Sequence, residues 1–189
     1  MASNKKNGLT CVLFHDKDEG EYFGKLLAFQ FLKDFLNEYS EDTFLGRTFN
    51  SNTYSAFSSK LFAVVDHSLE TFLTEFQKKQ CCQCVLFLQE ESEPIVVGNV
   101  IDQYAFVANL QIIIQQAAEV MLRLKDCFRE LFLCMGRQFL KIITISEGSY
   151  FVVVCNSSWD LKKLMVSIDE ATLCLKKFLN LIYCWSVVS

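Results

Sequence analysis

The sequence predicts a mixed α/β domain in which a mostly antiparallel sheet is flanked by helices. Short apolar runs typical of strands come in pairs joined by short turns, and such hairpins favour antiparallel pairing. Longer segments with apolar residues at helical spacing separate these pairs. Apolar residues make up 51% of the 189 residues and only one residue is proline. This composition supports a sizeable buried core rather than disorder.

The first quarter of the chain predicts a strand followed by a helix. The segment from Leu9 to Phe14 is short and apolar, as strands are. From Phe23 to Tyr39 an aromatic residue or leucine recurs every fourth position, which predicts a helix of about five turns. We therefore expect residues 1–53 to form a strand–helix extension and residues 54–189 to form the main domain.

The main domain is predicted to run helix, two strands, helix, two or three strands, helix. A helical stripe extends from Phe57 to Phe76, and a central helix is predicted from Leu110 through Leu131, with Gly136 marking its end. A weaker fifth strand is predicted over Leu161–Ile168, before a last helix capped by Asp169. The other predicted strands are Cys84–Leu88, Ile95–Val100, Phe139–Ser146 and Ser149–Cys155.

The hydrophobic pattern from Tyr54 to Trp185 resembles that of roadblock domains, the family of dynein light chain roadblock and of the Ragulator subunits. QCVLFLQEESEPIVVGNV is similar to the first hairpin of the family, and FLKIITISEGSYFVVVCN is similar to its second hairpin. AAEVMLRLKDCFRELF resembles the central helix, and EATLCLKKFLNLIYCW resembles the closing helix. The related longin fold has similar elements in a different order and is the alternative.

This resemblance implies a non-enzymatic adaptor or scaffold subunit of a cytoplasmic complex. Roadblock domains dimerise, often through the central helix and the neighbouring strand, and they are platforms for small GTPases, motor subunits or signalling complexes. Some similar proteins regulate GTPase cycles without binding the nucleotide. The expected partners are therefore proteins, in a homodimer or a heterodimer, including a small GTPase, and recruitment to an organelle surface would come through those partners. The alternative is a longin-like membrane-trafficking subunit.

The central helix carries two apolar stripes, whereas a helix that covers one sheet needs only one. We expect the first stripe to face the sheet; it contains Leu110, Ile113, Ala117, Val120, Leu124, Cys127 and Leu131. The second stripe is the predicted partner interface; it contains Ile114, Ala118, Met121, Phe128 and Phe132. Equally, residues 1–53 could cover this second stripe within the chain. If it binds a partner, aspartate at Met121 or Phe128 should abolish binding, whereas Leu124→Asp should unfold the domain.

Charge and hydropathy exclude several classes of partner. The net charge is −4 and no stretch clusters lysine and arginine, so a nucleic-acid or anionic membrane surface is not expected as a partner. The polar start MASNKKNG predicts no signal peptide. The most apolar run, Ala105–Ile114, is ended by two glutamines, so we predict no membrane insertion and a cytoplasmic location.

The nine cysteines predict reduced thiols rather than a metal site or a cofactor site. Cys81, Cys82 and Cys84 lack a fourth ligand, and neither His15 nor His67 has the spacing of a zinc motif. Reduced cysteines commonly behave as small buried hydrophobes. We interpret five of them in this way: Cys11, Cys84 and Cys155 in strand-like runs, and Cys127 and Cys174 in helix-like patterns.

A thiol-dependent hydrolase is the alternative from another functional class. Cys82 and His67 would be its nucleophile and base, but no residue can be placed that orients the base or builds an oxyanion hole. The acidic run from Asp16 to Glu21 lacks the ligand spacing of a calcium loop. We therefore predict no catalytic residues.

Overall fold

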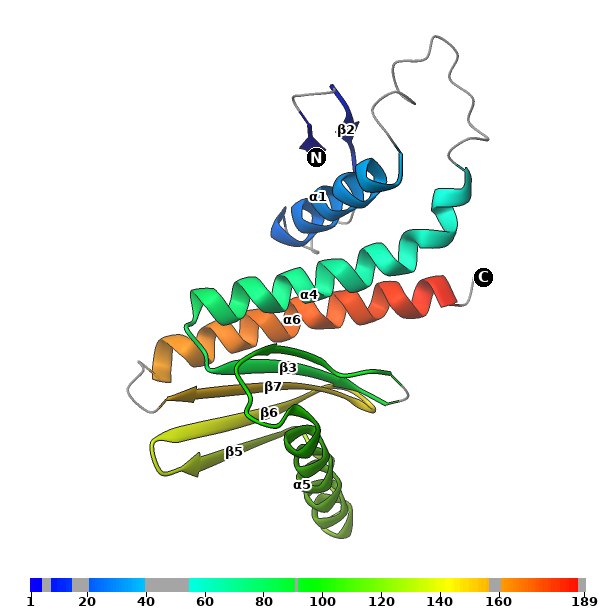
Figure 1. Ribbon diagram of the computed structural model, residues 1–189. Coiled ribbons are helices and arrows are strands. Elements are labelled where there is room, and N and C mark those ends of the chain that lie inside the picture. Colours follow the sequence, from blue (N-terminus) through cyan, green and yellow to red (C-terminus); the bar gives the residue numbers. More distant parts are fainter. Residues whose placement is uncertain (5–7, 15–20, 40–54, 91, 157–160, 187–189) are drawn as a thin grey trace. The chain divides into compact units, whose positions relative to one another are not determined.

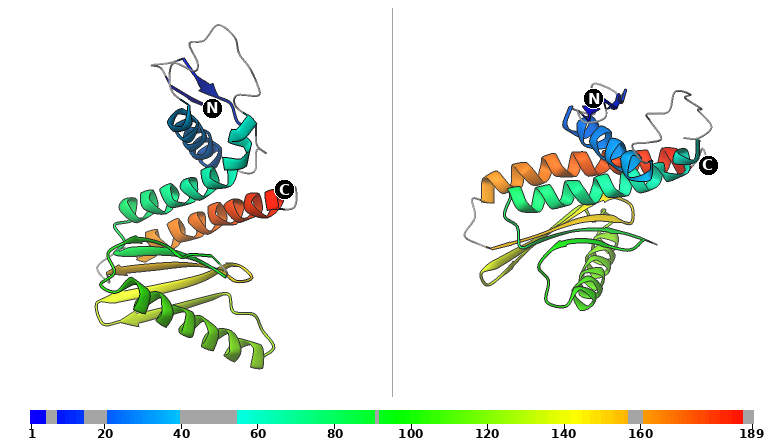
Figure 2. Two further views of the ribbon diagram at one scale, coloured as in Figure 1. Left: turned by 45° about the vertical axis from the view of Figure 1, so that its right-hand side comes forward. Right: turned by 45° about the horizontal axis from the view of Figure 1, so that its top comes forward.

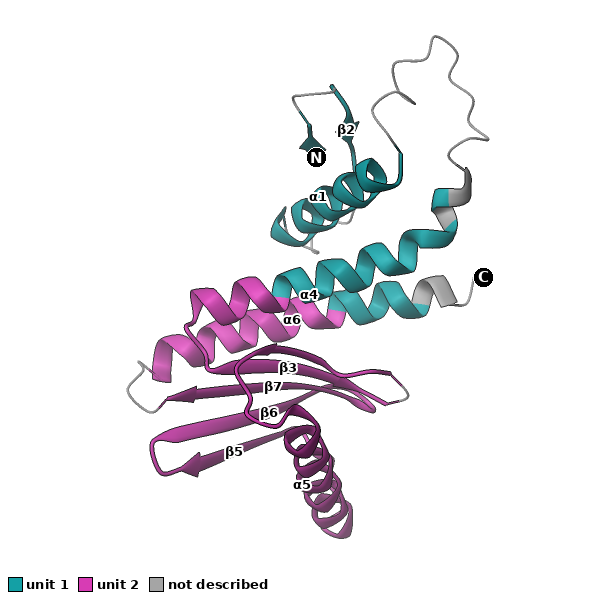
Figure 3. Cartoon of the chain, in the orientation of Figure 1, with its two compact units in different colours: residues 1–72, 177–189 teal, residues 73–176 magenta. Residues whose placement is uncertain are grey.

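The computed structural model describes residues 1–4, 8–14, 21–39, 55–90, 92–156 and 161–186. Two compact units divide the chain, as Figure 3 shows: Met1–Phe72 together with Lys177–Ser189, and Leu73–Lys176. Helices α4, Leu61–Lys79, and α6, Leu161–Ser186, contribute residues to both units. A domain boundary after residue 53 stays a prediction.

The second unit contains a five-stranded sheet in which every neighbouring pair is antiparallel. Its spatial order is β4-β3-β7-β6-β5 (Figure 1). The strands are β3, Cys84–Gln89; β4, Ile95–Gly98; β5, Glu130–Met135; β6, Gln138–Ser146; and β7, Ser149–Asn156. The predicted antiparallel sheet is confirmed.

Helices cover both faces of this sheet (Figures 1 and 2). Helix α5, Gln103–Arg123, buries Val107, Leu110 and Ile114 in a cluster with the side chains of β3, β6 and β7 that point to the same face. On the other face, where the second-unit parts of α4 and α6 lie, the Phe76 ring packs edge-on against Phe151 at 5.5 Å. Because β3 and β7 are buried on both faces, they are continuous apolar runs rather than alternating ones.

Helix α5 has well-defined ends, and its second end differs from the prediction. The Asp102 carboxylate accepts the backbone N–H of Ala105 at 3.0 Å, an N-cap. After Arg123 the chain turns through Lys125, whose φ of 59° is left-handed. The backbone N–H groups of Lys125 and Asp126 bond back to the carbonyls of Leu122 and Met121, both at 3.0 Å. This is a Schellman ending, so the prediction of a helix through Leu131 was wrong.

The residues predicted to form the last helical turns instead form strand β5. Leu131 and Leu133 pack against the core cluster on the α5 side, whereas Phe132 stacks on Phe139 with ring centroids 5.5 Å apart. Alternation of this kind is the strand period. Gly136, with φ of 62°, belongs to the turn between β5 and β6 rather than to a helix end.

The fifth strand predicted over Leu161–Ile168 was also wrong, because α6 begins at Leu161. Leu164, Ile168, Ala171 and Leu175 are all buried. Their spacing of three and four residues is that of one helix face, and Asp169 lies inside the helix rather than capping it.

The first unit contains the predicted N-terminal helix, here α1, Glu21–Glu38. The strand predicted over Leu9–Phe14 is reduced to β2, Thr10–Cys11, which pairs antiparallel with β1, Ala2–Ser3. A short 3₁₀ helix, η2, Ser55–Lys60, leads into α4.

Aromatic side chains hold α1 in the first unit. The Phe23 ring packs edge-on against Phe178 at 5.0 Å. At the other end of α1, the rings of Phe31 and Phe35 both pack edge-on against Phe57, each at 5.1 Å. Aromatic pairs in such T-shaped geometry contribute beyond the area that they bury. The predicted Phe-rich helix therefore forms part of a folded core.

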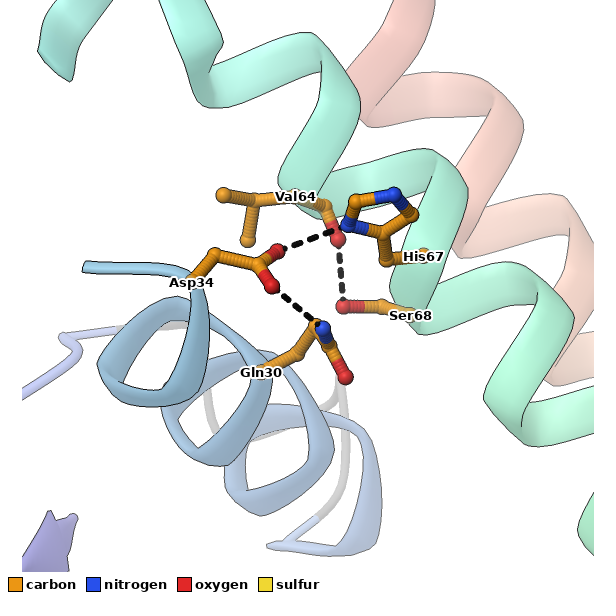
Figure 4. Close-up of polar contacts among 5 residues, drawn as sticks. All are labelled: Gln30, Asp34, Val64, His67 and Ser68. Carbon is orange, nitrogen blue, oxygen red and sulfur yellow. Dashed lines mark hydrogen bonds and ion pairs between the residues drawn. The ribbon is translucent and has the colours of Figure 1, made fainter. Parts of the chain in front are cut away.

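A polar cluster lies between α1 and α4 (Figure 4). The Asp34 carboxylate accepts a hydrogen bond from Gln30 Nε2 at 2.8 Å and lies 2.9 Å from Nδ1 of His67. Gln30 is buried, whereas the His67 side chain is 54% exposed. This polar contact joins α1 and α4 in addition to the aromatic packing of the first unit.

Candidate protein interface

Strand β5 is one of the two edge strands of the sheet, opposite β4, and pairs with β6 alone among the described strands. An edge strand carries backbone N–H and C=O groups that a further strand can bond. Two large apolar side chains of β5, Phe132 and Met135, are exposed. Proteins commonly protect an edge strand by keeping it short or by covering it with charged side chains. Strand β5 has six residues and exposes these two apolar side chains, so neither protection is complete here.

The outer half of α5 is the second part of this region. It exposes Ile112, Val120 and Leu122, and Leu124 just after the helix is 69% exposed. Leu122 is 75% exposed. Isolated exposed leucines are ordinary, but several on one helix beside an open strand indicate a binding surface. We use the name β5–α5 surface for the exposed apolar residues of the edge strand and of the helix, which lie on both faces of the sheet at this edge: Ile112, Val120, Leu122, Leu124 and Met135, together with Phe132 on the face opposite α5.

The five residues predicted as one interface stripe do not form one stripe. Ile114 is in the core, and Ala118 and Met121 are half-buried. Phe128 lies in the segment that joins α5 to β5, packed against the core with its ring 6.3 Å from Tyr150. Phe132 is on the sheet face opposite α5. Partner contacts by these residues stay a prediction.

The expected orientation of the helix was wrong for a geometric reason. Residues three or four apart share a helix face, so Leu110 of the first stripe and Ile114 of the second belong to one buried arc, and both are buried. Leu124, expected to face the sheet, is exposed. The surface residues Ile112 and Leu122 were missed, because both lie among exposed polar residues of the helix, such as Gln111, and outside both apolar stripes.

By length and composition alone, Gln103–Arg123 is long and apolar enough to cross a membrane, although the apolar pattern had predicted no such segment. One side of this helix is in the core, through Val107, Leu110 and Ile114. Its outer half also carries exposed polar side chains: Gln111, Gln115, Gln116 and Glu119. Such side chains suit a protein partner or water better than hydrocarbon.

The groups considered for thiol chemistry have other partners. Cys82 Sγ lies 3.0 Å from Cys155 Sγ, and this hydrogen bond, together with burial, raises the pKa of Cys82 far above that of an ordinary thiol. A nucleophilic cysteine needs a lowered pKa. His67 contacts Asp34, while the neighbouring Ser68 hydroxyl donates to the Val64 carbonyl at 2.7 Å (Figure 4).

The described cysteines are all free thiols. Cys84 and Cys155 are buried as predicted, whereas Cys11 and Cys174 are partly exposed. Cys127 is exposed, so its prediction as a buried hydrophobe was wrong. Within the described ranges, no group of three or more His, Cys, Asp or Glu side chains is arranged to hold a metal ion.

Comparison with solved structures shows a roadblock-like fold. Myxococcus xanthus MglB matches with a TM-score of 0.54 and 14% identity, over 59% of this chain and 90% of that one. MglB in a tetrameric arrangement gives 0.50 and 15% identity, over 57% and 85%. The Roadblock/LC7 domain from Streptomyces avermitilis gives 0.51 and 13% identity, over 58% and 96%. The predicted fold is confirmed. No protein-family model and no curated protein matches the chain.

Proposed function

We propose that this chain is a non-enzymatic adaptor subunit that pairs with a second copy of itself through the β5–α5 surface and presents the dimer to cytoplasmic proteins. The observation that carries the proposal is the combination of an open edge strand with exposed apolar side chains on the adjoining helix. A two-fold axis would place each β5 antiparallel to its copy and bring the two α5 helices together. Every contact would then occur twice.

The energetics favour such a pairing. Full burial of a leucine or isoleucine side chain stabilises by about 1.5–3 kcal/mol, and a symmetric dimer would bury Ile112, Leu122 and Leu124 from both copies. Strand pairing would also satisfy the open backbone groups of β5. Because association has a large entropic cost, contacts of both the strand and the helix are needed to make dimerisation favourable.

The resemblance to roadblock domains extends this proposal to small GTPases or their regulators as partners. The test is binding of the full chain to purified small GTPases loaded with GDP or with a non-hydrolysable GTP analogue. Binding that depends on the nucleotide state would support this extension. Absence of binding across the tested GTPases would contradict the GTPase extension while leaving self-association standing.

Hydrogen exchange tests whether β5 pairs with β5 of a second copy. In a dimer, the β5 amides that β6 does not bond would be protected, and dilution or Leu122→Asp would remove this protection. The β7 amides, at the centre of the sheet, are the internal control, because they should stay protected in every sample. Equal, fast exchange of the outward β5 amides at every concentration would contradict strand pairing.

A further inference from the structure

Two buried thiols of the second unit lie unusually close together. Cys82 follows the end of α4 and Cys155 lies on β7, and their sulfur atoms are 3.0 Å apart. Both side chains are buried, with residue exposures of 3% and 0%. A disulfide bond is about 2.05 Å long, so a shift of roughly 1 Å would bring the two sulfur atoms to bonding distance.

The backbone holds both residues in place. After α4 ends, Cys81 has a left-handed φ of 46°, and the backbone N–H of Cys82 bonds to the Gln77 carbonyl at 3.0 Å. Gln77 Nε2 returns a hydrogen bond to the Cys82 carbonyl at 2.6 Å. The next residue, Gln83, donates its N–H to the Val154 carbonyl at 2.9 Å. The sulfur contact is therefore fixed by hydrogen bonds on both sides.

The two thiols are also chemically unequal. The contact with Cys82 and a backbone hydrogen bond from Gln83 lower the pKa of Cys155 against the effect of burial. The same contact, together with burial, raises the pKa of Cys82. One sulfur is thus prepared as a nucleophile, and the other is a neighbouring thiol that can resolve an oxidised intermediate.

We propose that Cys82 and Cys155 form a redox-sensitive dithiol that a hydroperoxide oxidises to an intramolecular disulfide. Cys155 Sγ attacks one peroxide oxygen, forming an S–O bond as the O–O bond breaks, and the Cys155 proton leaves with the released alcohol or water. Cys82 Sγ then attacks the sulfenic sulfur, and the S–S bond forms as the S–O bond breaks. The departing hydroxide takes the Cys82 proton and leaves as water. The peroxide is reduced by two electrons, and the two thiols are oxidised by two.

The disulfide would close a ring from residue 82 to residue 155, which contains β3, β4, α5, β5 and β6. It would tie the turn after α4 to a central strand, so oxidation stabilises the sheet. For a ring of this size, an increase in Tm of about 5–10 °C is expected. Because both sulfurs are buried, only a small oxidant can reach them, and the reaction is slower than oxidation of an exposed thiol.

The experiment treats the native full chain with hydrogen peroxide, blocks free thiols and maps tryptic peptides without reduction. Cleavage places Cys82 in peptide 80–123 and Cys155 in peptide 142–162. We expect these two peptides cross-linked, with the loss of two hydrogens, and separated again by dithiothreitol. The exposed neighbour and the second buried thiol of the same peptide are the controls: Cys81→Ser and Cys84→Ala should keep the cross-link, and Cys82→Ala should lose it.

Two results would overturn the proposal. One is peroxide oxidation of the exposed Cys81, Cys127 and Cys134 while Cys82 and Cys155 remain free thiols in folded protein. The other is a cross-link that persists in Cys82→Ala, because a different cysteine would then be the partner of Cys155. The wild-type peptide map alone decides the first point, so the test does not depend on how well a variant folds.

Discussion

Asp34 on α1 lies 2.9 Å from Nδ1 of His67 on α4, and the same carboxylate accepts a hydrogen bond from the buried Gln30. Because an ionised carboxylate can only accept hydrogen bonds, the histidine ring nitrogen donates here. The Asp34 side chain is only 16% exposed. The carboxylate therefore joins a surface histidine to a buried amide and fixes how α1 meets α4 within the first unit.

Asp34→Ala should lower the free energy of unfolding by about 1–3 kcal/mol, because it leaves the buried Gln30 amide without its acceptor. His67→Ala should cost only about 0–1 kcal/mol, since the ring is largely in water. Urea denaturation followed by circular dichroism measures both. Glu38→Ala, which removes an exposed ion pair with Lys60 at 2.5 Å, is the matched control and should be nearly neutral. Equal losses for Asp34→Ala and Glu38→Ala would show that the buried amide does not matter.

Gly98→Ala should be strongly destabilising, by about 2 kcal/mol or more. Gly98 has a φ of +105°, and an added Cβ would lie 2.3 Å from the Gln83 carbonyl oxygen in the neighbouring chain segment. Gly136 provides the comparison: its φ is +62° and nothing lies within 4 Å of an added Cβ. Asparagine tolerates that conformation, so Gly136→Asn should cost less than about 1 kcal/mol. Thermal melts that rank the two variants in the opposite order would contradict this account of the β3–β4 pair.

The Cys84 thiol should make the free energy of unfolding fall as the pH rises above about 9. Burial, with a smaller effect of Cys155, raises the pKa of Cys84 to about 12. The unfolded chain loses this proton near the ordinary thiol pKa while the folded chain keeps it. The contribution of Cys84 to stability is therefore complete below about pH 9 and falls by about 1.4 kcal/mol per pH unit toward pH 12.

Cys84→Ala removes this dependence while losing some packing. The stability difference between wild type and Cys84→Ala should shrink from pH 8 to pH 10, as measured by urea denaturation at each pH. Parallel stability curves across this interval would mean that the thiol is not protected from ionisation.

Variants at neighbouring positions of α5 should differ in melting temperature, because neighbouring side chains differ in burial. Met121 is half-buried beside the sheet-facing arc, whereas Leu122 is 75% exposed. Met121→Asp should therefore lower Tm by several degrees, and Leu122→Asp should leave the melt of the isolated subunit nearly unchanged. Leu110→Asp, at a fully buried position, is the unfolding control. Similar melting temperatures for Met121→Asp and Leu122→Asp would mean that a different side of α5 faces the sheet.

The sequence predicted β3, β6 and β7 well because strands covered on both faces are unbroken apolar runs bounded by turns. It missed β5 because Leu131 also fits the helical spacing from Leu124, and because the chain leaves α5 through Lys125, whose backbone takes the left-handed conformation where glycine is the usual signal. The start of α6 was misassigned because Leu161–Ile168 is a short apolar segment whose period is ambiguous.

The candidate interface was predictable only in part. Phe132 was identified because it is large and apolar, and it lies exposed on the edge strand. Ile112 and Leu122 were not identified, since they are single apolar residues among exposed polar ones on the helix. Leu124 was assigned to the stripe that faces the sheet, because the apolar spacing continues past Arg123, where the helix ends.

The measurement that tests the central claim most directly is the mass of the full chain in solution by light scattering, from about 1 to 100 μM, for wild type and Leu122→Asp. One subunit has a mass of 21.8 kDa. The β5–α5 surface predicts wild-type protein at twice this mass and Leu122→Asp at the mass of one subunit, with its circular dichroism spectrum still that of the folded chain. A wild-type monomer at every concentration, or a dimer that survives Leu122→Asp together with Ile112→Asp, would contradict the claim that this surface joins two copies of the chain.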